Sequence, residues 1–147
     1  MLHGGFQVKV DEKGRVKLPS DFRRSCIERY GDGPYYITSL RGDCANIYPG
    51  RAWEEVMNKI ASQPATQPRI AKLRRYTSYF GQMVSMDPQG RVLVPAVLRE
   101  RALIKDQVMV LGQKDHLELW NLERFQQTLD SDPITPEDED YFSTLGL

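Results

Sequence analysis

Two short stretches of the sequence each place an aspartate four residues before an arginine, with a glycine directly before the arginine. They read DEKGR, from Asp11 to Arg15, and DPQGR, from Asp87 to Arg91. Such an aspartate can accept hydrogen bonds from the N–H groups of a tight turn and hold the arginine side chain in one direction. A guanidinium held in this way can donate two hydrogen bonds to a planar acceptor pair such as O6 and N7 of a guanine.

Both stretches belong to a longer internal repeat. Residues 11–23 and 87–99 are identical at six positions, namely Asp11/Asp87, Gly14/Gly90, Arg15/Arg91, Val16/Val92, Pro19/Pro95 and Arg23/Arg99. Farther along, GDCANIYPGRAW at 42–53 aligns with KDHLELWNLERF at 114–125. The repeat therefore extends across each half of the chain.

Hydrophobic periodicity predicts the elements that position the first motif. Residues 6–10 alternate apolar and polar side chains, the turn DEKG follows, and residues 15–18 alternate again, which predicts a β-hairpin. Pro19 suits the start of a helix, and an apolar face predicts that helix over residues 20–31, with Gly31 as its terminator.

The second copy has the same pattern, with strands at 81–86 and 91–95 and a short helix at 96–103. Each copy continues with a second strand pair, and an amphipathic helix over 50–63 and another over 69–80 connect the copies. One repeat unit is too small to bury much apolar surface alone. We therefore expect the copies to interleave their strands into one pseudo-symmetric, barrel-like body with flanking helices.

Composition is that of a soluble protein, with 40% hydrophobic and 27% charged residues. No segment reaches the roughly 20 apolar residues of a membrane helix, and the N-terminus has no apolar run suited to a signal peptide, so we expect a cytosolic protein. Cys26 and Cys44 are predicted to be reduced and packed, and the isolated His3 and His116 predict neither a metal site nor a cofactor.

The formal net charge is zero, but the charges are unevenly distributed. Residues 1–24 hold six Lys and Arg against three Asp and Glu, and residues 65–80 hold four Lys and Arg against none. The balancing acidic residues lie in the C-terminal tail. The simplest interpretation of that tail is a disordered, solubilising end, and another is that it competes with DNA for the basic hairpins.

The paired Asp-x-x-x-Arg motifs, with GRVKLP and GRVLVP behind them, resemble those of the MraZ family, which is built from two tandem SpoVT/AbrB-like swapped-hairpin units. This resemblance implies an α+β, mainly β fold. It places the first AbrB-like unit at 1–54, connecting helices at 55–80, the second unit at 81–129 and an acidic, flexible tail at 130–147.

The resemblance also implies a function. We expect a cytoplasmic, nucleoid-associated transcriptional regulator that binds double-stranded DNA at repeats upstream of the division and cell-wall gene cluster. It implies a homo-oligomer, expected to be a ring, with no membrane partner, no small-molecule substrate and no cofactor.

Candidate DNA-binding residues follow from the motif and its surroundings. Arg15 is expected to read bases, while Lys9, Lys13 and Lys17 on the same outward side would contact phosphates. The resemblance adds Arg23 and Arg24 at the following helix, and the second copy supplies Arg91 and Arg99. Supporting residues are Asp11, Gly14, Asp87 and Gly90.

The second copy lacks several of these cations. Gln89, Leu93, Ser85 and Glu100 stand at the positions of Lys13, Lys17, Lys9 and Arg24. We therefore expect the N-terminal hairpin to dominate binding and the C-terminal hairpin to be partly structural.

Three other interpretations remain. Each Asp–Arg pair could be a local ion pair that only stiffens a turn. A catalytic aspartate dyad is opposed by the arginine four positions on, which would keep each carboxylate ionised. An antitoxin-like interaction module without direct DNA readout is opposed by the tandem duplication and the short tail.

Overall fold

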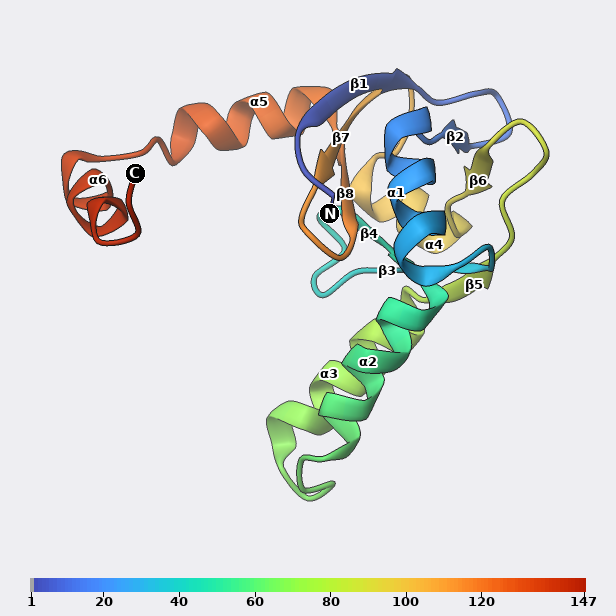
Figure 1. Cartoon of the computed structure of the whole chain (residues 1–147), viewed down its shortest axis with the longest axis horizontal. Coiled ribbons are helices and arrows are strands. Elements are labelled where there is room, and N and C mark those ends of the chain that lie inside the picture. The colour runs from blue at the N-terminus through green and yellow to red at the C-terminus, as the bar shows by residue number, and fades with distance from the viewer. Residues whose placement is uncertain (1) are drawn as a thin grey trace.

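Strands from both halves of the chain are interleaved in one antiparallel sheet (Figure 1). The computed structural model describes residues 2–147. Six strands follow the order β1-β7-β8-β4-β3-β5, with the bounds Gly5–Lys9 (β1), Tyr35–Thr38 (β3), Ala45–Pro49 (β4), Gln82–Val84 (β5), Gln107–Gly112 (β7) and Leu117–Asn121 (β8). Strands β2 (Arg15–Lys17) and β6 (Arg91–Leu93) form a separate two-stranded ribbon.

Helices complete the fold, which confirms the predicted α+β class. The expectation of a mainly β chain is wrong, because helices hold more of the described residues than strands do. They are α1 (Ser20–Tyr30), α2 (Gly50–Ala61), α3 (Pro68–Tyr79), α4 (Ala96–Ala102), α5 (Leu122–Ser131) and α6 (Pro136–Ser143). Helices α1 and α4 follow the two ribbon strands, and each begins directly after a proline, Pro19 or Pro95. The fixed φ of proline suits this position, so the repeated proline starts the same helix twice.

The predicted hairpin over residues 6–18 is wrong in its strand partners. Strand β1 pairs with β7 from the other half of the chain, and β2 pairs with β6, so β1 and β2 share only an isolated bridge between Val10 and Val16. Alternating hydrophobicity indicates which face of a strand is buried but not which strand lies beside it. Pairing β2 with β6 sets Val16 opposite Val92, so the same repeated valine fills the core from both copies.

The main sheet does not close into a barrel, which corrects that expectation. The two edge strands of the sheet are β1 and β5, and they do not pair with each other. The copies do interleave, because β1, β4 and β3 come from the first half and β7, β8 and β5 from the second.

One core is shared by the two halves. The inward side chains of the ribbon, Val16 and Val92, are at most 1% exposed and belong to the same buried cluster as Leu18, Leu98 and Val108.

The two cysteines are buried and free, as predicted. Burial raises the pKa of the Cys26 thiol to about 11 and that of the Cys44 thiol to about 12. At neutral pH both thiols are therefore protonated and poor nucleophiles.

Two helical segments extend from this body (Figure 1). Helices α2 and α3 project together away from the sheet and are anchored at its base, where Trp53 stacks on Tyr36 at 4.6 Å and Thr38 donates a 2.7 Å hydrogen bond to the carbonyl of Thr77. Helix α5 leads from β8 to α6, which begins with a capping box between Thr135 and Asp138. Among residues 2–147 no helix is long and apolar enough to cross a membrane.

The exchanged pairing of β1 predicts a disulfide that a local hairpin would not allow. Gln7 lies directly opposite Met109, so the Gln7→Cys/Met109→Cys variant should cross-link readily on mild oxidation. Mass spectrometry of tryptic peptides under non-reducing conditions measures the bond. The control is Gln7→Cys/Leu111→Cys, because Leu111 lies opposite Gly5. Equal cross-linking of both pairs would contradict this register.

Candidate nucleic-acid interface

The first Asp–Arg motif forms a turn in which one carboxylate organises both backbone and side chain. Oδ1 of Asp11 accepts hydrogen bonds of 2.9 Å from the N–H groups of Lys13 and Arg15, and Oδ2 accepts a 2.7 Å bond from Nε of Arg15. Gly14 has φ of 85°, a left-handed conformation that other residues adopt only with strain. The glycine therefore permits the turn, and the aspartate fixes the direction of the arginine.

The second motif repeats this geometry. Asp87 accepts 2.9 Å bonds from the N–H groups of Gln89 and Arg91 and a 2.7 Å bond from Nε of Arg91, and Gly90 has φ of 80°. Both predicted turns and both Asp–Arg contacts are therefore confirmed at the level of geometry.

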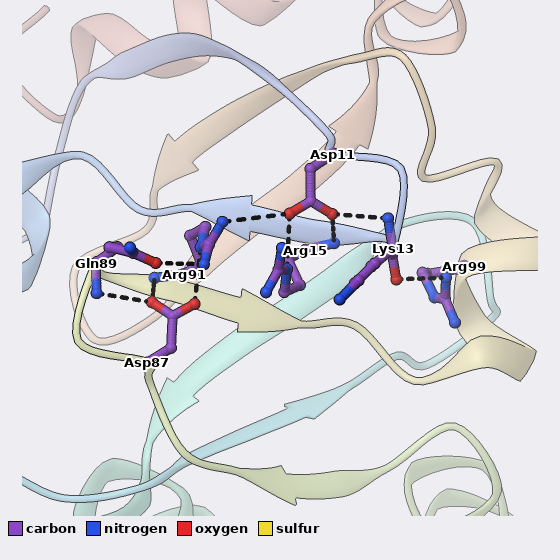
Figure 2. Close-up of polar contacts among 7 residues, drawn as sticks. All are labelled: Asp11, Lys13, Arg15, Asp87, Gln89, Arg91 and Arg99. Atoms are coloured by element: carbon purple, nitrogen blue, oxygen red, sulfur yellow. Dashed lines mark hydrogen bonds and ion pairs between the residues drawn. The ribbon is translucent and has the colours of Figure 1, made fainter.

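The ribbon brings the two motifs together, although they lie 76 residues apart in the chain (Figure 2). Arg15 lies opposite Leu93 and Lys17 opposite Arg91, while Val16 and Val92 point into the core. Nη1 of Arg91 is 3.7 Å from Oδ2 of Asp11, so the two motifs form one cluster. This single surface was not predicted, because it depends on the exchanged strands.

The two arginines are not equivalent. Within residues 2–147, the Nη atoms of Arg15 make no hydrogen bond or ion pair. In contrast, Nη2 of Arg91 donates to Oε1 of Gln89, and its Nη1 faces Asp11. Lys13 stands at the position equivalent to Gln89 and has no side-chain acceptor, so the outer edge of Arg15 stays open.

Arg23 and Arg99 each lie against the turn of the other copy of the repeat. Arg99 contacts the turn at Gly14, and Arg23 contacts the turn at Gly90. Arg99 donates from Nη1 to the carbonyl of Lys13 at 3.2 Å, and a Cβ added to Gly14 would clash with that guanidinium. A Cβ added to Gly90 would clash in the same way with the guanidinium of Arg23. The Nε of Arg23 is buried without a hydrogen-bond partner in the described residues. Both arginines therefore brace the turns, a role that was not predicted because each contact joins residues far apart in the sequence.

The predicted lysines lie around this cluster. Lys9, Lys17 and Arg23 line one shallow hollow of about 510 Å³, and Lys13 is exposed on the first turn. Arg24 is different: it pairs with Asp21 at 3.2 Å and lines a separate hollow beside residues 3–6. The structure thus groups the predicted lysines near the ribbon and gives Arg24 another neighbourhood.

Charge around the motif carboxylates opposes proton sharing. The N–H of Arg15 lowers the pKa of Asp11 below 3.8, against the opposing effect of desolvation, and the N–H of Arg91 does the same for Asp87. A catalytic dyad requires one raised pKa. Both carboxylates are instead anions that offset the charges of the two arginines, so the excess positive charge of this surface comes from the surrounding Lys and Arg residues.

These lowered pKa values predict a pH dependence of stability. A carboxylate with a depressed pKa in the folded state stabilises the fold above its unfolded pKa, and this contribution is lost as pH falls through the folded value. The unfolding free energy of Asp11→Asn/Asp87→Asn should be lower than wild type near neutral pH and should decline less steeply below about pH 4. Urea titrations at several pH values measure both. Parallel curves for the two proteins would contradict this role.

Comparison with known proteins places both halves of the chain in one family. The chain matches a family model described as "MraZ protein, putative antitoxin-like" over residues 1–75 and 81–142. It is 45% identical over 147 residues to a transcriptional regulator MraZ of Acidobacterium capsulatum and 40% identical over 147 residues to one of Koribacter versatilis, covering 100% of each chain. A third, of Herpetosiphon aurantiacus, is 35% identical over 133 residues, which is 89% of this chain and 88% of that protein.

These relatives are all named as transcriptional regulators, not as enzymes. The match spans both copies of the repeat and includes both Asp–Arg turns. The resemblance inferred from the paired motifs is thereby confirmed, and the chain belongs to the MraZ family.

Proposed function

We propose that this protein is a sequence-specific DNA-binding transcriptional regulator and that the β2–β6 ribbon enters the major groove. A two-stranded ribbon fits the width of that groove, where each base pair displays a distinct pattern of donors and acceptors. The buried pair of Val16 and Val92 makes the ribbon a fixed part of the body, so its outward side chains need little ordering on binding.

One observation carries this proposal. Nε of Arg15 is held by Asp11 at 2.7 Å, while its Nη atoms are unpartnered within residues 2–147 (Figure 2). The guanidinium therefore has a fixed direction and open donors, as recognition of guanine O6 and N7 requires. An ion pair that only stiffened the turn would have no need of the surrounding lysines.

The surrounding cations supply affinity without sequence information. Lys9, Lys13 and Lys17 are exposed near the ribbon and would contact phosphates, with Arg23 and Arg99 holding the turns. Arg91 contributes less freely than Arg15, because Gln89 already engages one of its Nη atoms. This arrangement keeps the first copy dominant, and it places the second copy on the same surface instead of on a separate hairpin.

Family membership supports a wider proposal for the function of the protein. The protein acts in the cytoplasm at the nucleoid, on repeats upstream of the division and cell-wall gene cluster, without a cofactor and without catalysis. A homo-oligomer, expected to be a ring, presents several ribbons to tandem sites, so avidity raises the affinity of a protein with no net charge.

A second candidate is a protein-interaction module of the antitoxin-like class. The wording of the family description and the exposed side chains of the helical extensions, such as Tyr79 and Tyr141, favour it. This candidate requires no DNA binding at all, which the following measurement decides.

Arg15→Ala should lower affinity for DNA carrying the upstream repeats by about 5- to 150-fold, because one bidentate pair of hydrogen bonds to a base is removed. Arg91→Ala should have a smaller effect, because Gln89 and Asp11 already engage that side chain. Gel-shift titration at fixed salt measures both.

Arg74→Ala is the matched control for charge, because Arg74 is exposed on α3, away from the ribbon. Its affinity should equal that of wild type. Undiminished binding by Arg15→Ala would overturn the site, and absence of binding by the wild-type protein would favour the interaction module.

Lys17→Ala should weaken binding similarly on specific and unrelated DNA, because interactions with phosphates carry no sequence information. It should also reduce the slope of log affinity against log salt by about 0.9, since one phosphate is no longer neutralised. Titrations on both duplexes at four salt concentrations measure this. Weakening confined to the specific duplex would contradict the assignment of Lys17 to the backbone.

A further inference from the structure

The outward face of the ribbon contains one apolar side chain among cations. Leu93 is 45% exposed and stands where the first copy has Lys17. The other outward residues are Arg15, Lys17 and Arg91. The repeat is therefore symmetric in its arginines and asymmetric in the residue two positions after each of them.

Strand register places Leu93 beside the open guanidinium. Leu93 lies directly opposite Arg15 in the antiparallel β2–β6 pair. Side chains opposite each other in such a pair have Cβ atoms about 4.5–5.5 Å apart. Base pairs stack at a spacing of about 3.4 Å along the helix. A duplex that offers a guanine to Arg15 would therefore hold an adjoining base pair over Leu93.

The chemistry of the groove limits what Leu93 can contact there. Base edges in the major groove present hydrogen-bond donors and acceptors and one apolar group, the C5 methyl of thymine. Setting a leucine against an unpaired polar edge leaves that edge without water or a partner, which is unfavourable. A thymine methyl loses water without losing a hydrogen bond, so it is the complement of an exposed leucine at this position.

We propose that Leu93 is a specificity-determining residue that packs against the C5 methyl of a thymine next to the guanine bound by Arg15. The inference rests on the proposed function and adds a second base to it. Lys17 occupies the equivalent position of the first copy, so the two halves of the ribbon offer different side chains to the groove.

The test removes the methyl group alone. The probe is a duplex chosen by sequencing genomic fragments that the purified full-length protein retains, with each thymine replaced in turn by deoxyuridine. Base pairing and all hydrogen-bonding groups are unchanged by this replacement. Wild-type affinity should fall about fourfold at one thymine, the value for one buried methyl-sized group. Leu93→Ala should bind the thymine and deoxyuridine duplexes equally.

Val97→Ala is the matched control, since Val97 is 44% exposed on α4 and outside the ribbon. It should keep the wild-type sensitivity to deoxyuridine. Leu93→Lys, which copies the first unit, should lose that sensitivity while keeping affinity for unrelated DNA.

The outcomes separate this inference from the proposed function. DNA binding that no deoxyuridine weakens, or sensitivity that persists in Leu93→Ala, would overturn the inference and leave the proposed function standing. A change in the mass of Leu93→Ala by light scattering would also overturn it, because Leu93 would then lie between copies of the chain. Failure of the wild-type protein to bind any DNA would overturn both.

Discussion

The antiparallel pairing of β2 with β6 is the interaction on which the rest of this structure depends. It buries Val16 against Val92 in a core that both halves share, and it turns the alternate side chains outward. Because the two strands lie 76 residues apart, the pairing also converts two separate turns into one surface with two arginines. Without it, each Asp–Arg turn would sit at the end of an isolated hairpin, and Arg91 would lie away from Asp11. The cluster is therefore a product of tertiary structure, although each half of it is local.

The sequence allowed the local turns and helices to be predicted. It did not allow prediction of which distant strands and side chains lie next to each other. The spacing of Asp11 and Arg15 predicted the turn and its side-chain contact, because both involve atoms within five residues of the chain. Prolines and apolar periodicity likewise predicted the helices that follow the ribbon. A strand with alternating apolar and polar residues can pair with any antiparallel neighbour that leaves its apolar face buried. The predictions of a local hairpin and of a closed barrel were therefore wrong. The bracing of Gly14 by Arg99 was missed because it joins residues 85 positions apart in the sequence.

Arg15 and Arg91 are equivalent in the repeat, but residues that differ between the two copies give them different surroundings. Asp11 and Asp87 hold both guanidinium groups in the same way, with the same distances. The difference lies in neighbours: a lysine beside Arg15 leaves its outer donors open, whereas Gln89 accepts from Arg91. Positioning and exposure are thus controlled by different residues in this fold. The aspartates and glycines were retained in both copies, while the positions that set charge and contact diverged.

The exchange of strands also dictates when this surface can come into being. Strand β1 finds its neighbour in residues 107–112, and β2 finds its own in residues 91–93, so neither can pair while only the first half has left the ribosome. Contacts between such distant segments form late and slowly, since a long loop must be closed first. A nascent chain consequently carries Arg15 on an unpaired strand until residues 91–93 have been synthesised. Chains that end before residue 91 would lack this paired surface altogether.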